Sequence, residues 1–463
     1  MKHKIKKIHF IGIGGVGMSG IAEVLHHLEY AISGSDISNN YNTDRLHKLG
    51  INIYIGHHAN NIKNVDAVVT STAIDESNVE IIEAKKHGIM LVPRAQMLAE
   101  LMRFKYGIAI AGTHGKTTTT SLCAEVFTAC GLDPTYLIGG KLAVSGANAQ
   151  LGKGEYLIAE ADESDASFLY LSPLVAVVTN IDLDHMATYN YDENELKKTF
   201  VDFLHRLPFY GIAILCNEDI RVREIIPSVN RKIITYGLSA ESDIYASNVK
   251  ANGNRMSFDV HIKKNNKIIN VDLNLVGEHN VLNALAVIAV SLECECNIDG
   301  ILKGLSIFHG VGRRCQHYPD LIINNKAIPL IDDYGHHPNE IKATLSALKN
   351  AYLNKRLVLI FQPHRYTRTR DLFDDFMNVL PNADILIITE IYGAGEEPIP
   401  MIDGRFLVKS LHNKGVNVFF ANDLECARDM VYGIVKDGDL VLTMGAGSIG
   451  KLPQMLIEGV KND

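Results

Sequence analysis

The stretch "AIAGTHGKTTTT", residues 109–120, decides the fold because it joins a strand pattern to a helix pattern through a glycine loop. The apolar run "YGIAIAG" leads into the loop, and "TTTTSLCAEVFTAC" leaves it with helical spacing. In the phosphate-binding motif G-x-x-x-x-G-K-[ST], counted back from Gly115, Lys116 and Thr117, the first glycine would be residue 110. That residue is Ile110, and the nearest glycine is Gly112. The loop is therefore a shortened version of this motif.

The shortened loop has the groups needed to hold phosphate at the start of a helix. Backbone N–H groups and the helix dipole favour an anion there. Gly112 and Gly115 let the backbone approach phosphate without a Cβ. Lys116 supplies a charge for the terminal phosphates, and Thr117 supplies an oxygen for Mg²⁺. The alternative is a glycine turn with a chance Gly-Lys-Thr, but the flanking strand and helix favour an ATP-type loop.

Acidic residues follow two later strand patterns, where a metal would need ligands. "LIAEADESD", 157–165, and "VVTNIDLDHMATY", 177–189, each end an apolar run. Ligands bind at the carboxyl ends of strands in open α/β sheets, and Mg²⁺ prefers oxygen. We therefore predict a metal site there; its candidate ligands are Glu160, Asp162, Glu163, Asp165, Asp182, Asp184 and His185. From its spacing alone, His185 is a core histidine or a partner of a ligand.

The N-terminal stretch "GIGGVGMSG", 12–20, is a second glycine turn between a strand and a helix. Asp36 ends the next strand, at about the distance of the acid that binds a ribose hydroxyl in dinucleotide-binding folds. Alone, this pattern indicates an NAD-dependent dehydrogenase. Combined with an ATP-type loop, it favours two phosphorylated ligands, a nucleotide-linked substrate and ATP.

Two polar segments near the C-terminus complete the candidate site. "IDDYGHHPNEI", 331–341, ends a strand pattern, and "QPHRYTRTRDLFDDF", 362–376, follows another. Arginines clustered at a strand end suit phosphate or carboxylate recognition. The alternative for any single arginine is a solvated loop. The pair His336 and His337 lacks the spacing of helical metal ligands.

Strand and helix patterns alternate along all 463 residues, which is typical of parallel α/β sheets. We predict an α/β protein of three domains. They are an N-terminal Rossmann-like domain at 1–103, a central domain with a P-loop-type, mostly parallel sheet at 104–312, and a C-terminal Rossmann-like domain at 313–463. A hairpin is expected at 255–275, and a hinge at "HGVGRR", 309–314.

Composition excludes several classes of protein. The formal net charge of −8 argues against nucleic-acid binding. Seven scattered cysteines without a CxxC indicate neither a disulfide framework nor a zinc site. No apolar run reaches the ~18 residues of a membrane span, and the glycine-rich N-terminal run meets Glu23, unlike a signal peptide. We expect a cytoplasmic protein that does not insert into membranes.

Taken together, these motifs resemble the Mur ligase family, the ATP-dependent amide-forming enzymes of peptidoglycan synthesis. The resemblance covers nearly the whole chain through "GIGGVGMSGIA", "SGSD", "STAI", "GTHGKTTT", "EADESD", "TNIDLDHM", "GEHNVLNALA", "HGVGRR", "DDYGHHPNEI", "QPHRYTRTRDLFDDF", "TEIYGAGEEPI" and "GAGSIG". It implies that L-alanine is joined to the carboxylate of UDP-N-acetylmuramate through an acyl phosphate made with ATP. The expected partners are small molecules, in a monomer or weak homodimer.

The resemblance also implies roles for individual residues. The metal ligands would be Thr117, Glu160 and His185, so for His185 the resemblance overrides the interpretation from spacing. The catalytic residues would be Lys116, Glu160, His185, Arg314 and Asp333, the last two reaching ATP when the domains close. ATP would bind Gly112, Thr113, His114, Gly115, Lys116, Thr117, Thr118, Asn280, Asn283 and Arg314. UDP would lie on Gly14, Gly15, Val16, Gly17, Asp36, Ser71 and Arg94, and the amino acid would face His336, Arg365 and Arg368.

Two positions depart from the family pattern. Cys315 stands where an aromatic residue is expected beside the ATP site. A carbamylated lysine used by several relatives would fall at Phe200, with Lys197 and Lys198 out of register, so we predict none. The alternatives left open are a murein-peptide ligase, an NAD-dependent dehydrogenase and a nucleotide-binding regulatory module without catalysis.

Overall fold

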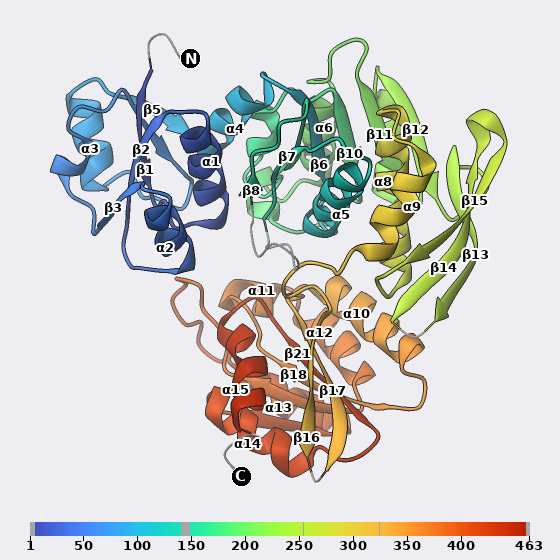
Figure 1. Cartoon of the computed structure of the whole chain (residues 1–463). Helices are drawn as coiled ribbons and strands as arrows, with labels where there is room; N and C mark the ends of the chain where they lie inside the picture. The colour runs from blue at the N-terminus through green and yellow to red at the C-terminus, as the bar shows by residue number, and fades with distance from the viewer. Residues whose placement is uncertain (1–4, 140–148, 253, 324, 460–463) are drawn as a thin grey trace. The chain divides into compact units, whose positions relative to one another are not determined.

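The computed structural model describes residues 5–139, 149–252, 254–323 and 325–459. Its contacts divide the chain into two units, which are described separately. The first comprises Met1–Asn248, Phe258–Leu273 and Val281–Phe308, and the second Val249–Ser257, Asn274–Asn280 and His309–Asp463. The described strands form three sheets, which Figure 1 shows in blue, green to yellow, and orange to red.

The N-terminal sheet has the order β3-β2-β1-β4-β5, with its strand pairs parallel. Its elements are β1 (Lys7–Ile11), α1 (Val16–His27), β2 (Ala31–Asp36), α2 (Tyr41–Lys48), β3 (Asn52–Ile55), β4 (Ala67–Thr70), α3 (Val79–Lys86), β5 (Met90–Pro93) and α4 (Arg94–Met102). Because the order reverses at β1, the glycine turn after β1 lies where ligands bind in such sheets.

The central sheet has the order β15-β14-β13-β12-β11-β10-β6-β9-β7-β8. Its strands are β6 (Tyr106–Ala111), β7 (Thr135–Leu137), β8 (Ala149–Gln150), β9 (Tyr156–Glu160), β10 (Val175–Val178), β11 (Ile212–Cys216), β12 (Lys232–Gly237), β13 (Ile244–Asn252), β14 (Arg255–Ile262) and β15 (Lys267–Leu273). Its helices are α5 (Lys116–Ala129), α6 (Glu193–Leu204), α7 (Ile220–Ile225), α8 (Glu278–Glu293) and α9 (Ile298–Ile307). β6 pairs in parallel with β9 and β10, so the loops after these strands meet at one edge.

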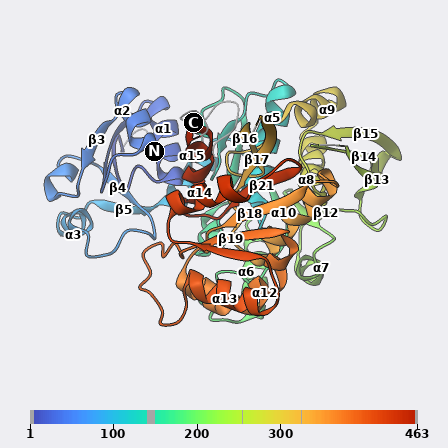
Figure 2. The ribbon, with the colours of Figure 1, turned by 90° about the horizontal axis from the view of Figure 1, so that it is seen from below.

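The C-terminal sheet has the order β16-β17-β21-β18-β19-β20, of which Figure 2 gives a second view. Only the pairing of β16 with β17 is antiparallel among these described strands. The strands are β16 (Gln316–Ile323), β17 (Lys326–Asp333), β18 (Arg356–Phe361), β19 (Ile385–Thr389), β20 (Val418–Ala421) and β21 (Asp439–Met444). The helices are α10 (Pro338–Ala351), α11 (Tyr366–Asp371), α12 (Phe373–Val379), α13 (Gly404–Asn413), α14 (Leu424–Ile434) and α15 (Leu452–Gly459).

These sheets confirm the predicted fold class of three α/β domains. The expected hairpin is also present: the alternating apolar residues of β14 are buried, from Met256 to Ile262, and so are Ile269, Val271 and Leu273 of β15. Over the described residues, no helix combines the length and the apolar character needed to cross a membrane. The exact domain boundaries and the hinge at 309–314 stay predictions.

Candidate active site

The shortened loop between β6 and α5 has room only for glycine at two positions. Gly112 has φ +128°, and a Cβ there would lie 2.1 Å from the Thr179 Oγ1 atom and 3.0 Å from the Asn180 backbone. Gly115 caps α5 with φ +83°, and its Cβ would lie 2.8 Å from the Asn283 Oδ1 atom. The loop is therefore pressed against the end of β10 and against α8, which fixes its shape.

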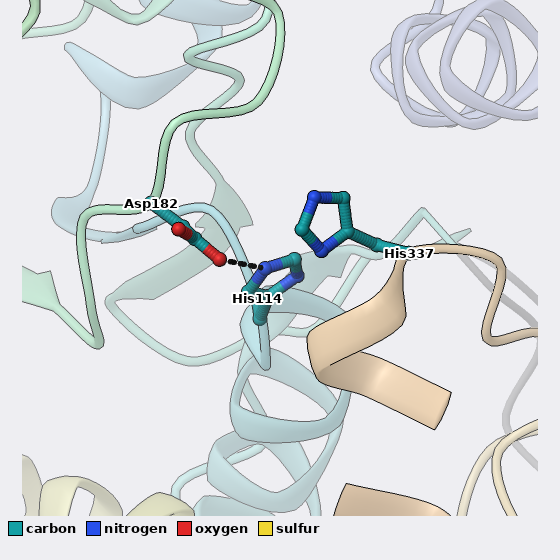
Figure 3. Close-up of side chains that lie close together, drawn as sticks. All are labelled: His114, Asp182 and His337. Atoms are coloured by element: carbon teal, nitrogen blue, oxygen red, sulfur yellow. Dashed lines mark hydrogen bonds and ion pairs between the residues drawn. The ribbon is translucent and has the colours of Figure 1, made fainter. Parts of the chain in front are cut away.

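Hydrogen bonds hold the middle of this loop to the segment after β10. The His114 N–H donates to Asn180 Oδ1 at 2.8 Å, and Asn180 Nδ2 donates to the His114 carbonyl at 2.9 Å. The His114 ring Nε2 lies 3.1 Å from Asp182 Oδ2, as Figure 3 shows. Figure 3 also draws His337, which belongs to the second unit and caps α10 by accepting the Asn339 N–H. Asp182 thus supports the loop through its contact with the His114 ring.

Lys116 is the first residue of α5, and its ammonium group has three oxygen partners. Nζ donates to the Gly112 carbonyl at 2.6 Å, to the Thr113 carbonyl at 3.1 Å and to Glu163 Oε2 at 2.6 Å. Glu163 is 3% exposed. Burial raises the pKa of Glu163 to about 7, although the Lys116 charge opposes the rise. Lys116 and Glu163 therefore form a buried ion pair directly at the phosphate loop.

The predicted metal ligands of this unit lie at the same sheet edge. Glu160 ends β9, beside Ile110 of β6, and its Oε1 accepts the Gly139 N–H at 2.8 Å. Thr117 is the second residue of α5 and is half-buried. The His185 ring, 36% exposed, has its Nε2 atom 3.6 Å from Asp184 Oδ2. A carboxylate and a hydroxyl beside a phosphate loop fit Mg²⁺, which prefers oxygen ligands; the imidazole is the less typical ligand.

The N-terminal glycine turn is held by Asp36 and Asn42. The Gly14 N–H donates to Asp36 Oδ2 at 2.8 Å, and Asn42 Nδ2 donates to the Gly14 carbonyl at 2.8 Å. Asp36 is 9% exposed. α1 then begins after Gly15 without a side-chain cap, so its N-terminus suits an anion. Asp36 therefore shapes the turn, and its contact with a ribose hydroxyl stays a prediction.

A cavity of about 370 Å³ connects the two glycine segments within the first unit. Its lining includes Gly15, Val16, Gly17, Ser71, Arg94, Lys116, Gly139, Glu160 and Asp162. Predicted residues of the UDP site and of the ATP site therefore line one cavity. Its volume lies within the ordinary range of small-molecule sites.

Arg94, the first residue of α4, lines this cavity. Its Nη2 atom lies 3.4 Å from Asp162 Oδ2, and its Nη1 atom lies 2.9 Å from where a Cβ of Gly17 would be. Burial would raise the pKa of Asp162, but hydrogen bonds from Ser164 and the charges of Lys116 and Arg94 hold it below its ordinary value. Asp162 therefore stays ionised between two cations.

The predicted asparagines of α8 fall in different units. Asn283 is 7% exposed and borders Gly115 in the first unit. Asn280 belongs to the second unit, where its Nδ2 donates to the Val276 carbonyl at 2.7 Å. Asn283 is thus placed beside the phosphate loop, and the contact of Asn280 with ATP stays a prediction.

In the second unit, Asp333 organises the segment around Arg314. Its Oδ2 atom accepts the Cys315 N–H at 2.8 Å, and its Oδ1 atom accepts the Gly335 N–H at 2.7 Å. Burial raises the pKa of Asp333, partly opposed by Arg314. The Arg314 guanidinium lies over the Tyr334 ring at 5.1 Å and 3.5 Å from Glu340 Oε1. Asp333 and Arg314 thus lie in one polar cluster.

The structure brings together part of the predicted amino-acid site. The His336 and His364 rings lie 5.5 Å apart, and Arg368 Nη1 lies 3.3 Å from His364 Nδ1. Burial lowers the pKa of each histidine to about 4. Arg365, with φ +69°, has its Nη1 atom 3.8 Å from Glu396 Oε1. His336, His364 and Arg368 are therefore close together, and the contact of these residues and of Arg365 with an amino acid stays a prediction.

Family models match the chain in three consecutive parts. "Mur ligase family, catalytic domain" matches residues 7–106, "Mur ligase middle domain" matches 110–291, and "Mur ligase, glutamate ligase domain" matches 313–447. The chain belongs to the Mur ligase family.

Individual relatives extend this finding over 98% of the chain. The UDP-N-acetylmuramate–L-alanine ligase of Aromatoleum aromaticum is 54% identical, with 98% of each chain covered. The ligase of that name from Chromobacterium violaceum is 55% identical, again with 98% of each covered. The crystal structure of the Thermotoga maritima UDP-N-acetylmuramate–alanine ligase has a TM-score of 0.84 at 29% identity, covering 98% of this chain and 99% of that one.

The structure shows the surroundings of the two positions that depart from the Mur ligase pattern. Cys315 has φ +45° and a half-buried thiol whose pKa burial raises. Phe200 of α6 is fully buried, its ring 5.2 Å from that of Phe168. Lys197 pairs with Glu193 and Glu224, and Lys198 with Asp202. The position expected for a carbamylated lysine is thus part of the core.

Sequence reasoning missed three contacts of this Mur ligase site. Asn180 was not singled out, although it holds the phosphate loop through two hydrogen bonds. Glu163 was placed among metal ligands and instead pairs with Lys116. Thr72 Oγ1 donates to Asp165 Oδ2 at 3.1 Å, tying the Ser71 loop to the acidic segment. Pairing across 47 to 93 residues leaves no local sequence signal.

Proposed function

We propose that this Mur ligase joins L-alanine to the carboxylate of UDP-N-acetylmuramate, with ATP converted to ADP and phosphate. The observation that carries the proposal is the single cavity lined by the N-terminal glycine turn and by Lys116. A ligase must hold a nucleotide sugar and ATP with their reacting ends close together. A dehydrogenase does not need the ATP-type phosphate loop at residues 112–117. Family membership also favours the ligase over that alternative.

In the first step, the muramate carboxylate attacks the γ-phosphorus of ATP, giving an acyl phosphate and ADP. The phosphates lie on residues 112–118 at the N-terminus of α5. Lys116 balances the charge of the transferring group, because its Nζ reaches the centre of the loop. Gly14 to Gly17, Ser71 and Arg94 bind the UDP diphosphate at the start of α1. Asp36 holds this turn in shape.

Mg²⁺ would be held by Thr117, Glu160 and His185. When bound, this ion supplies positive charge to the phosphate oxygens. The Gly139 N–H donates to Glu160 Oε1 and helps to orient this carboxylate. The remaining charge balance in the cavity falls to Lys116 and Arg94, the cations that line it.

In the second step, the deprotonated amine of L-alanine attacks the acyl carbon, and phosphate leaves as the amide forms. His336, Arg365 and Arg368 of the C-terminal domain face the amino acid, with the arginines on its carboxylate. Arg314 and Asp333 act on ATP from the same domain. The low pKa of His336 and of His364 keeps both rings uncharged at neutral pH. The enzyme acts in the cytoplasm as a monomer or weak homodimer.

The test is phosphate release from ATP with UDP-N-acetylmuramate and one acceptor at a time. L-Alanine should give faster release than glycine or L-serine, and far faster release than a murein tripeptide. A preference for the tripeptide would instead identify a murein-peptide ligase. Release that needs no acceptor at all would reject the ligase function, and a change in nicotinamide absorbance would support a dehydrogenase.

A further inference from the structure

Two neighbouring carboxylates each face a cation that we assign to phosphate binding. Glu163 Oε2 lies 2.6 Å from Lys116 Nζ in the ATP loop. Asp162 Oδ2 lies 3.4 Å from the Nη2 atom of Arg94, which faces the UDP turn. One dipeptide after β9 therefore contacts the cations of both phosphate sites.

The ammonium group of Lys116 has no spare donor. It carries three N–H bonds, and they are matched by the Gly112 carbonyl, the Thr113 carbonyl and Glu163. A phosphate oxygen can bind Nζ only if it replaces one of these acceptors. The two carbonyls belong to the loop that cradles the phosphate. Glu163 is thus the partner that can exchange without changing the shape of the loop.

Arg94, which also lines the cavity, has a carboxylate partner that a phosphate can replace. Its side chain is 24% exposed and that of Asp162 is 41% exposed, so both are open to a ligand in the cavity. A diphosphate that enters beside α1 meets the positive Arg94 and the negative Asp162 together. Because like charges at short range repel strongly in a partly buried site, Asp162 has to give way before phosphate binds well.

Hydrogen bonds hold together the segment that carries both carboxylates. Asp162 Oδ1 accepts the N–H of Ser164 at 3.1 Å and its hydroxyl at 2.7 Å. The Glu163 carbonyl accepts the Ala166 N–H at 3.0 Å and also the Tyr189 hydroxyl. A displacement of either carboxylate is therefore transmitted to the other.

We propose that Asp162 and Glu163 are positioning residues that act as internal counter-anions. Each carboxylate pairs with its cation until a phosphate group of a ligand replaces it. Binding of a ligand at one phosphate site therefore favours binding at the other. This inference rests on the proposed function, since it assigns Lys116 to ATP and Arg94 to UDP. By thermodynamic reciprocity, the nucleotide sugar tightens ATP binding by the factor by which ATP tightens sugar binding.

Calorimetric titration of the full chain at pH 8 tests the coupling. A non-hydrolysable ATP analogue with MgCl₂ is titrated with and without saturating UDP-N-acetylmuramate. In the wild type, the sugar nucleotide should tighten analogue binding about fivefold or more. The ratio of analogue affinities with and without the sugar nucleotide measures this coupling. In Asp162→Asn and Glu163→Gln, this ratio should fall below about twofold. Glu163→Gln should bind the analogue alone at least as tightly as the wild type, because the competing anion is gone.

Glu155→Gln is the matched control, because it removes the same charge from an exposed residue just before β9, at the opposite end of the strand. It should keep the wild-type ratio. A wild-type ratio near one overturns the inference, and so does a ratio that survives in both variants. Weaker analogue binding by Glu163→Gln, at an unchanged melting temperature, also overturns it. A wild type that binds neither ligand contradicts the proposed function instead.

Discussion

Replacing Gly112 with alanine tests the argument that the phosphate loop has no room for a side chain. The new Cβ would lie 2.1 Å from Thr179 Oγ1 and 3.0 Å from the backbone of Asn180, well inside contact distance. The backbone angle φ of +128° is also one that alanine rarely adopts. The loop therefore has to move away from the end of β10, where Asn180 holds His114.

Two unfavourable contributions to the free energy of folding add up in Gly112→Ala. A non-glycine residue in such a backbone region costs about 1–3 kcal/mol, and the overlap in a packed region costs about 1–3 kcal/mol more. A loss of about 2–6 kcal/mol in a domain of some 200 residues lowers the melting temperature by about 5–20 °C. Nucleotide binding should be lost as well, because the displaced loop no longer presents its N–H groups to phosphate.

Gly131→Ala is the control, since Gly131 follows α5 with φ +77° and has nothing within 4 Å of its Cβ position. It should lose only about 1–2 kcal/mol from the left-handed backbone and keep nucleotide binding. Thermal melts and titration with the ATP analogue measure both effects. Equal melting temperatures and equal analogue affinities for the two variants would refute the steric reasoning.

Three further outcomes are expected. Lys116→Met should reduce ATP-dependent phosphate release by about 100-fold or more while UDP-N-acetylmuramate still binds in a direct titration; retained turnover would contradict the role of Lys116. Because burial raises the pKa of Glu163 from 4.5 to about 7, the unfolded chain binds fewer protons between these values, and the free energy of unfolding should fall as the pH rises through this window. Urea denaturation should show a smaller fall in Glu163→Gln. An identical change of the free energy of unfolding with pH in the variant and the wild type would contradict this prediction. Phe200→Ala should cost about 3–5 kcal/mol in the same assay, whereas alanine at Phe209, which is 90% exposed, should cost under about 0.5 kcal/mol.

Local patterns in the sequence were enough to predict the elements that carry the site. The apolar run 106–111 and the helix after Gly115 are present as β6 and α5. The alternation at 255–275 is present as β14 and β15, because each apolar side chain on one face is buried. These features depend on residues close together in the chain, so their signal is local.

The pairing of charges could not be predicted in the same way. Glu160 ends β9 and three further acidic residues follow it, and nothing in "EADESD" says that Glu163 faces Lys116 or that Asp162 faces Arg94. Which acidic residue faces which cation depends on the backbone turns of residues 162–166 and on the register of β9 against β6. The hydrogen bond from the Gly14 N–H to Asp36 was not predicted for a similar reason, since the dinucleotide fingerprint specifies residue spacing and not hydrogen bonds.

The hydrogen bond from the Gly14 N–H to Asp36 determines what the N-terminal turn can distinguish in a nucleotide. Only Oδ2 is used in this way, and among the described residues Oδ1 accepts no more than the Ser38 N–H at 3.4 Å, so the carboxylate can still accept a hydroxyl of a sugar. The residue that shapes the turn is then also one that can tell a ribonucleotide from a 2′-deoxyribonucleotide.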